Sequence, residues 1–425
     1  MAVRGLLARW AVRGTAVLLV EVPGGWAARV AVEQAMVARG WRAATSPADA
    51  DALVVCGAPG EGWDEVLERT WAQMPGPRTR ASMLSEAGAG AALDAVAASL
   101  LDDDAQRADA AARDLVPSDV TEGGDMDPAG LQLAGGEDDL RDGLEMDVLR
   151  VPLGPVLPDW PAGLVLRTVL SGDVVVRARV EVLPGLGGAP VDEPARRLDA
   201  AAQVLRLAGA DDLAARAVRL RDAALTSRTS SSQRPDDAPP PRTSSTDRPQ
   251  EGALSITSST ERGEGEAGAT DGRRSAGEVG ELRGRVERSR VLAWALREAD
   301  VATSSPSSGA ESDAAHVSAP DDPRDVGLDE QRRTRDDVRT LLLGLLDPEV
   351  HDDDPRGRTR AALEALPERL VGVDVVTARL LVAALDLRTD ALGADDLATL
   401  APRDDEADDS GGAGGEHAHH GHAHG

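Results

Sequence analysis

The sequence lacks several residue types that most folded chains of its size use. Its 425 residues contain no Phe, Tyr, Lys or Asn, one Ile and one Cys, and aromatic residues make up 2% of the chain. Any hydrophobic core must therefore be built from Leu, Val and Ala. Because the missing types are written with AT-rich codons, the composition indicates a GC-rich genome of the actinobacterial type rather than a functional specialisation.

The single cysteine, Cys56, limits the chemistry that the chain can perform alone. One thiol excludes a disulfide framework, so we expect a cytoplasmic protein. It also excludes an iron–sulfur cluster held by the chain's own thiolates, since nearly every iron of a cluster needs one. Cys56 ends an apolar run, and no histidine lies near it in the sequence. We therefore interpret Cys56 as a small buried residue rather than a nucleophile, and we predict no catalytic residue.

The chain is acidic and has no long apolar run. Its formal net charge is −28, which disfavours a nucleic-acid partner because phosphate would be repelled. Acidic stretches such as 102–104 are typical of solvated loops. No apolar run reaches the roughly 20 residues that cross a bilayer, and no signal-peptide pattern is present. We expect no direct membrane insertion, and contact with a membrane only through partner subunits.

Strand and helix patterns alternate over residues 1–116. Apolar runs at 14–21 and 51–57 predict buried strands, and a third strand is predicted after the Pro-Gly-Pro breaker within 74–84. The segments between and after these strands have helical periodicity. These predicted helices cover 26–39, 63–73 and 91–101. Alternation of this kind predicts a doubly wound, flavodoxin-like α/β domain with a parallel sheet.

The rest of the chain changes character several times. A β-hairpin is predicted around Ser171, Gly172 and Asp173, because Gly supplies the positive φ of a tight turn. Such a hairpin needs cover, so we expect it to pack on the N-terminal domain or on a neighbouring subunit. The predicted segments are a linker at 117–145, the hairpin with helices at 146–226, a disordered linker at 227–280, a helical region at 281–402 with a disordered insert at 302–327, and an acidic, His-rich tail at 403–425.

Two motifs near the N-terminus follow specific patterns. The run "ADALVVCGAPG" (50–60) has the form Ala-Asp-x-Leu-x-Val-x-Gly, and "LERTWAQMPGPR" (67–78) contains Gln-Met-Pro-x-Pro followed by a basic residue. Together they resemble the small subunit of nickel–iron hydrogenases and its counterpart in respiratory complex I, over roughly residues 15–100. The motif positions, which we expect to have structural roles, are Asp51, Gly57, Gln73, Met74, Pro75 and Pro77.

A second motif covers "VPLGPVLPDWPAGLVLRTVLSGDVVVRARVEV" (151–182). It resembles the N-terminal hairpin of the large subunit of the same family, which begins with Gly-Pro-x-His-Pro. Gly154, Pro155 and Pro158 match, whereas Leu157 takes the place of the histidine, near the segment that approaches quinone in complex I. Trp160 and Pro161 beside this motif could dock a partner.

The departures from the family bear directly on function. The family's small subunit places cluster-binding cysteines after its first strand, where this chain has "VPGGWAARV" with Gly24 and Gly25. We interpret this as a vestigial cluster loop, with Trp26 filling the volume of the cluster; an anion site before a helix is the weaker alternative. The paired Cys-x-x-Cys motifs of the nickel–iron site are also absent. The resemblance therefore implies that the folded part holds no cofactor.

The C-terminal "HAHHGHAHG" is the one candidate metal site in the sequence. Imidazoles at this spacing can chelate Ni²⁺, Zn²⁺ or Cu²⁺, and Glu416 could add an oxygen ligand. A low-complexity tail without a role is the competing interpretation. The candidate ligands are His417, His419, His420, His422 and His424.

Two functional hypotheses from different classes follow. The preferred one is a non-catalytic structural or accessory subunit of a complex I-like or membrane-bound hydrogenase-like assembly, whose partners are the other subunits. The alternative is a nickel-binding accessory protein that uses the histidine tail. An oxidoreductase that borrows its cofactors from a partner is weaker, because His316 and His351, the histidines outside the tail, lie in or beside polar segments.

Overall fold

The N-terminal part of the chain is built on a parallel sheet. The computed structural model describes residues 10–113, 133–138, 145–188, 192–232, 264–296, 338–349 and 354–400. The strands of the first sheet are β1 (Ala16–Glu21), β2 (Arg42–Ala43), β3 (Ala52–Cys56) and β4 (Thr79–Met83), all parallel, in the order β2-β1-β3-β4. This order is that of a flavodoxin-like, doubly wound sheet, so the predicted fold class is confirmed.

Side chains of both faces of the parallel sheet are buried. One face packs on α2 (Trp26–Arg39) and α4 (Ala89–Leu100). The other face packs on Trp63 of α3 (Trp63–Gln73), on Val165 in the first strand of the predicted hairpin and on Leu183 directly after its second strand. The expectation that the hairpin packs on the N-terminal domain is therefore confirmed.

The acidic stretch 102–104 begins a helix rather than a loop, so that interpretation is wrong. Asp102 caps α5 (Asp103–Ala112), and its carboxylate accepts hydrogen bonds from the backbone N–H groups of Asp104 and Ala105. Carboxylates stabilise a helix N-terminus because the first N–H groups lack backbone partners and the helix dipole is positive there.

A second, antiparallel sheet follows. It consists of β5 (Leu133–Asp138), β6 (Glu145–Leu153), β7 (Leu164–Ser171) and β8 (Val174–Val182) in sequence order. Gly172 has φ +62° in the β7–β8 turn, as the hairpin prediction requires. β5 lies inside the predicted linker at 117–145, so that boundary is wrong; its Gly-rich sequence carries no strand signal of its own.

Helices form the C-terminal part, and Gly209 separates the first two, as predicted. They are α6 (Glu193–Leu207), α7 (Asp211–Ser232), α8 (Glu264–Arg288), α9 (Arg290–Ala295), a helix at 338–345, α11 (Pro355–Leu370), α12 (Val375–Ala384) and α13 (Ala394–Leu400). The disorder predicted at 227–280 is wrong at both ends, because α7 extends to Ser232 and α8 starts at Glu264. Leu282 and Val286 anchor α8 in the core. The predicted insert at 302–327 lies outside the described residues.

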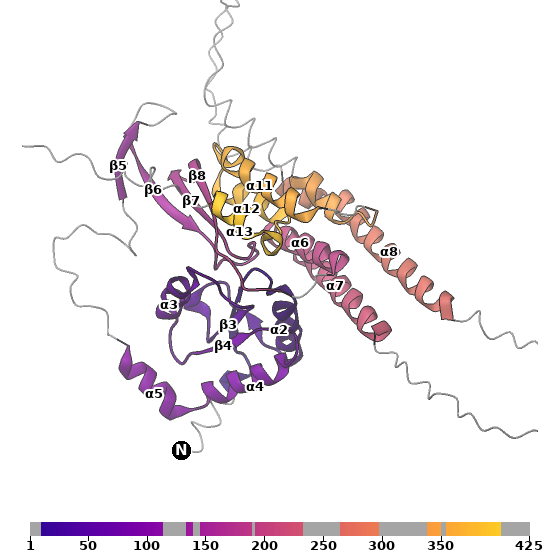
Figure 1. The fold of residues 1–425 in the computed structure, drawn as a ribbon, viewed down its shortest axis with the longest axis horizontal. Helices are drawn as coiled ribbons and strands as arrows, with labels where there is room; N and C mark the ends of the chain where they lie inside the picture. The colour runs from indigo at the N-terminus through magenta and orange to yellow at the C-terminus, as the bar shows by residue number, and fades with distance from the viewer. Residues whose placement is uncertain are drawn as a thin grey trace, which may run out of the picture.

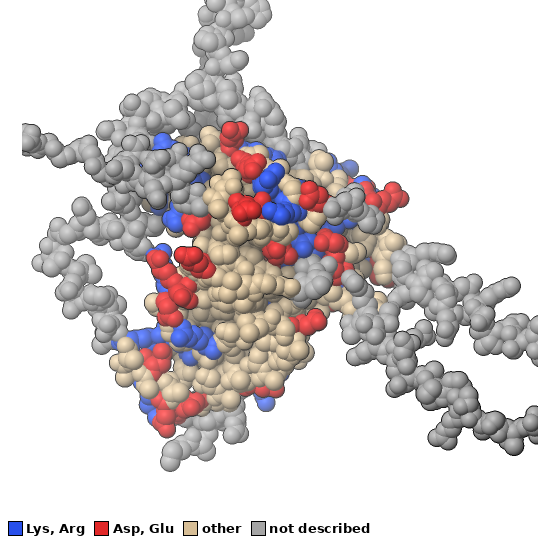
Figure 2. All heavy atoms as spheres, viewed as in Figure 1, with Lys and Arg blue, Asp and Glu red and all other residues tan. Residues whose placement is uncertain are grey.

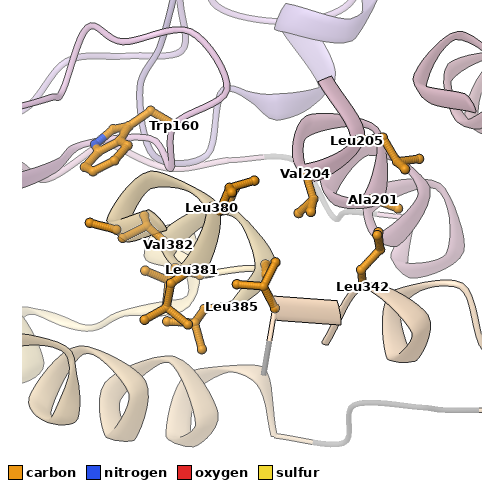
Figure 3. Close-up of a cluster of buried hydrophobic side chains, with 14 of the residues drawn as sticks. Trp160, Ala201, Val204, Leu205, Leu342, Leu380, Leu381, Val382 and Leu385 are labelled. Atoms are coloured by element: carbon orange, nitrogen blue, oxygen red, sulfur yellow. The ribbon is translucent and has the colours of Figure 1, made fainter. Parts of the chain in front are cut away.

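The largest hydrophobic core joins the hairpin to these helices. In Figure 3, Ala201, Val204 and Leu205 of α6 face Leu342, and the α12 side chains Leu380, Leu381 and Val382 lie beside Leu385. Trp160 is the one aromatic side chain among the described members of this core. The core is thus built from Leu, Val and Ala, as the composition predicts.

Figure 1 shows the arrangement of these parts. The α/β unit lies at one end, the second sheet and the helices lie at the other, and α6 and α7 run beside α2. Across the described ranges, no helix is both long and apolar enough to cross a membrane.

Candidate functional site

The carboxyl ends of the central strands β1 and β3, which we term the sheet edge, are the first place to look for a ligand. In open α/β sheets, ligands bind outside the carboxyl ends of the strands where the strand order reverses. Here the loops at that point carry the motif residues Gly24, Gly25 and Gly57. The Val22 N–H donates to Cys56 O at 2.9 Å, the Gly25 N–H donates to Val22 O at 2.7 Å, and the Gly57 N–H donates to Met83 O at 2.8 Å. Sequence analysis therefore identified residues that come together in space.

This sheet edge is covered by the chain itself. Residues 183–188 (LPGLGG), which we term the closing segment, run across it directly after β8. Pro184 O accepts hydrogen bonds from the Gly60 N–H at 3.1 Å and from Trp63 Nε1 at 2.9 Å, and the Leu186 N–H donates to Ala58 O at 2.8 Å. The closing segment is thus held to both the β3–α3 loop and the helix that follows it.

The contact is tight enough to require glycine. A Cβ on Gly24 would lie 2.0 Å from Gly187 O, and a Cβ on Gly185 would lie 2.0 Å from Pro23 O. At the inner side of the loop, a Cβ on Gly25 would lie 2.0 Å from Cys56 O. Backbone therefore fills the position where an open α/β sheet holds a cofactor.

Cys56 is part of the sheet's hydrophobic core. The residue is fully buried, and its thiol lies 4.0 Å from Val54 O. Burial raises the pKa of the Cys56 thiol to about 12. The thiolate, which is the form that binds metals and attacks electrophiles, is therefore scarce at neutral pH.

Trp26 does not fill the sheet edge, so the interpretation that it replaces a cluster is wrong. Its indole packs against Val30 and against Ala195 of α6, and its Nε1 donates to Asp199 at 2.9 Å. Trp26 starts α2, and its side chain is directed toward α6 rather than toward the sheet edge. The closing segment, not Trp26, covers that edge.

Asp199 is the centre of a buried ionic cluster. The cluster lies between two parts of the molecule, which we term its halves: the α/β unit, and the second sheet with its helices. Its carboxylate contacts Arg29 of α2, and it accepts a hydrogen bond from Arg221 of α7 at 2.6 Å. Burial alone would raise the pKa of Asp199, but Arg29 and Arg221 outweigh burial and place that pKa well below its ordinary value. Glu33 joins both arginines, and Glu21 pairs with Arg29. The cluster is fixed in its charged form and serves to hold the halves together.

A second ionic contact extends the cluster toward the C-terminal helices. Arg196 of α6 lies 3.3 Å from Glu21 and 3.8 Å from Asp386. Burial raises the pKa of Asp386, against the opposing effect of Arg196 and Arg358. Cys56 is the register partner of Glu21 in the parallel sheet, but its thiol is buried and its pKa is raised to about 12. We therefore assign both ionic groups a structural role.

The remaining motif residues lie directly before β3 and in the α3–β4 connection. Asp51 accepts a hydrogen bond from the Ala16 N–H at 2.8 Å and so joins the starts of β1 and β3. Met74 is buried, whereas Gln73, Pro75 and Pro77 lie exposed in the α3–β4 connection. The basic residue of the motif, Arg78, lies with its guanidinium 4.1 Å from the centre of the Trp71 ring.

The Gly154–Pro158 motif packs inside the chain. Gly154 has φ +88°, and a Cβ there would lie 2.4 Å from Trp160 Nε1. Trp160 Nε1 in turn donates to Leu164 O at 2.8 Å, and Pro158 O accepts from Arg379 at 3.0 Å. Trp160 and Pro161, which the sequence suggests as partner contacts, are buried within the chain itself.

A large open volume lies beside this motif. It is a cavity of about 720 Å³, which we term the α2–α7 cavity, and sequence analysis missed it. Cavities of this size accommodate a small molecule. Its apolar lining includes Leu19, Met36, Trp41, Leu157 and Trp160, and its charged lining includes Glu33, Asp159, Arg206 and Arg221.

The predicted metal ligands lie outside the described residues. These are His417, His419, His420, His422 and His424, together with Glu416; His316 and His351 also fall outside. Within the described ranges, no group of three or more His, Cys, Asp or Glu side chains could hold a metal ion.

Comparison with known proteins adds no relative. No protein-family model, no curated protein and no solved structure matches the chain. The likeness to hydrogenase and complex I subunits therefore rests on the sequence motifs.

Proposed function

We propose that the chain is a non-catalytic structural or accessory subunit of a complex I-like or membrane-bound hydrogenase-like oxidoreductase assembly. Its partners are the other subunits, and its folded part carries no redox cofactor. The motifs at 50–60, 67–78 and 151–182 suggest the family.

The closing segment is the observation that carries this proposal. Backbone of residues 183–188 contacts the loop at 23–25 so closely that a Cβ would clash at Gly24, Gly185 and Gly188, where it would lie 2.0–2.7 Å from backbone of the opposite segment. A cofactor at that edge would require the segment to leave, which would break its hydrogen bonds to Gly60, Trp63 and Ala58. The edge is therefore suited to scaffolding rather than electron transfer.

The joining of two halves in one chain supports the same proposal. In the family that the motifs resemble, these halves are separate neighbouring subunits. Here they share the Asp199 cluster and the packing of Val165 and Leu183 on the parallel sheet. Such a fused unit occupies the place of two subunits with a fixed relative orientation.

Isolation of the assembly tests this proposal. A tagged full-length chain, expressed in its native host and cross-linked before membrane solubilisation, should co-purify with antiporter-like or other oxidoreductase subunits in a fixed ratio. A Gly185→Val variant, which cannot keep the closing segment in place, should lose these partners, whereas Gly277→Ala, at an open position of α8, should keep them. Recovery of the chain without any oxidoreductase subunit contradicts the proposal.

The α2–α7 cavity favours a second candidate function, retention of a quinone-type ligand without redox chemistry. The cavity borders Pro155–Pro158, the segment that corresponds to the quinone-approaching part of the family, and its lining is mostly apolar. A short-chain naphthoquinone should quench tryptophan fluorescence of the full chain, since Trp41 and Trp160 line the cavity. Leu157→Trp should weaken this quenching because the larger side chain occupies part of the cavity, whereas Leu186→Trp, at an exposed position, should leave it unchanged. Equal quenching in the two variants would contradict binding of a quinone-type ligand in the α2–α7 cavity.

A further inference from the structure

The outward face of the second sheet carries an excess of basic side chains. Successive side chains of a strand point to opposite faces of its sheet, and the face opposite the hydrophobic core is rich in arginine. The charged residues that β6, β7 and β8 place there are Arg150, Arg167, Arg177, Arg179 and Glu181. Because the chain as a whole has a formal net charge of −28, this local positive charge indicates a surface that attracts anions.

The register of the strands groups the four arginines around one valine. Arg150 of β6 and Arg177 of β8 both lie opposite Val169 of β7, the strand between them. Two strand spacings, roughly 10 Å, therefore separate the backbones of these two arginines. Arg167 precedes Val169 by two residues, and it lies directly opposite Arg179. We term the four arginines the arginine face.

The pairing of Arg167 with Arg179 is unfavourable within the sheet itself. Residues directly opposite one another on antiparallel strands have Cβ atoms about 4.5–5.5 Å apart, and like charges at such positions destabilise the pair. Glu181 compensates Arg167, because its carboxylate lies 2.8 Å from the Arg167 guanidinium. An anion bound over the face would reduce the repulsion further.

The arginine face is open to solvent. All four arginines are exposed, and the Arg167 side chain is 59% exposed although it pairs with Glu181. Within the described residues, Arg150 and Arg177 have no ion-pair partner. Their guanidinium groups are therefore available to an external acceptor.

Charges are distributed differently on other parts of the surface. On the face of the molecule shown in Figure 2, basic and acidic side chains of the described residues are interspersed. Arg69 of α3 and Arg107 of α5, for example, each pair with acidic residues of their own helix. The arginine face instead groups four basic side chains with one acidic side chain.

The geometry of the arginine face fits carboxylates on an extended chain. A guanidinium binds a carboxylate through two parallel N–H···O hydrogen bonds, and an extended peptide presents every second side chain on one side, about 7 Å apart. Arg167 and Arg177 are diagonal neighbours across two strands, a relation that separates residues by about 7–8 Å. Carboxylates at alternate positions of one peptide therefore match the spacing of the face.

Nucleic acid fits the arginine face less well. Single strands are bound by stacking of their bases on aromatic side chains, and residues 148–153, 164–171 and 174–182 of the described sheet contain no aromatic residue. A long polyanion would also extend beyond the roughly 10 Å of the face, onto a body whose net negative charge repels phosphate. A short acidic segment avoids this repulsion.

We propose that the arginine face binds an acidic segment of a partner protein in extended conformation. This goes beyond the proposed function, which assigns partners but no contact surface. It does not depend on that function, because the face recognises carboxylates rather than a particular subunit.

Fluorescence anisotropy of a labelled deca-glutamate peptide, titrated with the full chain, tests this proposal. The wild type should bind the peptide at low salt and release it as salt is raised. The double variant R150E/R177E should weaken binding by roughly ten-fold or more, since each exposed ion pair contributes up to about five-fold. R150Q/R177Q, which removes the two charges without reversing them, should weaken binding less, and it decides the test by itself if R150E/R177E does not fold.

A matched control isolates the arginine face. R219E/R290E makes the same charge change at exposed positions of α7 and α9, and it should bind the peptide as the wild type does. Equal loss in R150E/R177E and the control, or no binding by the wild type at low salt, overturns the proposal. So does tighter binding of a deca-thymidylate oligonucleotide that R150E/R177E abolishes, because that result assigns the face to nucleic acid.

Discussion

Replacement of Asp199 by Asn tests the role of the buried ionic cluster. Asp199 is 1% exposed and faces Arg29, Arg221 and the Trp26 indole. The Asn side chain keeps the size of Asp but removes the charge, so two arginines remain buried with their shared partner lost. Removal of one member of a buried ion pair costs about 3–5 kcal/mol, mostly because the remaining charge is uncompensated.

Denaturant unfolding of the full chain measures this cost. The free energy of unfolding of Asp199→Asn should fall by about 3–5 kcal/mol. The control is Asp94→Asn, which removes a partner of Arg39 at 2.7 Å from an exposed position and should cost less than about 1 kcal/mol. A cost for Asp199→Asn no larger than that of the control refutes the idea that the cluster holds the two halves together.

The difference in the free energy of unfolding between wild type and Asp199→Asn should depend on pH, because the pKa of Asp199 is lowered in the folded chain. A carboxyl whose folded pKa lies below its unfolded value of about 3.9 stabilises the fold fully above that value, and the stabilisation is lost as pH falls toward the folded pKa. The stability gap between wild type and Asp199→Asn should therefore be constant from neutral pH to about pH 5 and shrink below about pH 4. A gap that widens in acid contradicts this assignment.

Three further predictions test other parts of the account. Gly185→Ala should destabilise the chain by about 1–3 kcal/mol, because its Cβ would lie 2.0 Å from Pro23 O, whereas Gly277→Ala in α8 should not destabilise it; equal unfolding midpoints would argue against a tight closing segment. Native Cys56 should resist alkylation at neutral pH and react once the chain is unfolded, because burial raises its pKa to about 12; rapid labelling of the folded chain would show an accessible thiolate. Deletion of residues 416–425 should abolish Ni²⁺ binding in equilibrium dialysis without changing the melting temperature; unchanged Ni²⁺ binding would exclude the tail as the site.

Local signals predicted the regular elements of the first sheet. The runs that became β1 and β3 are apolar and are closed by turns at Pro23 and Gly57, whereas β4 was predicted from the Pro-Gly-Pro breaker before it. The segments between the strands have helical spacing. β2 was missed because it has two residues, both exposed. α5 was missed because its acidic cap, Asp102, is typical of loops as well as of helix starts.

Long-range contacts could not be predicted in the same way. Residues 183–188 suggest only the end of a hairpin, and their contact with Pro23 and Gly24 joins segments far apart in the chain. One signal of the ionic cluster was present in the sequence. Asp199 lies among Leu198, Ala200, Ala201 and Ala202 on the buried side of α6, and a carboxylate in that setting requires a buried cation.

The iron and acid-labile sulfide content of the full chain, purified anaerobically from cells that supply iron–sulfur clusters, tests the central claim most directly. Because the closing segment fills the sheet edge and Cys56 is buried, the account predicts less than stoichiometric iron and no visible absorption. A stoichiometric cluster with the spectrum of a redox centre would contradict it.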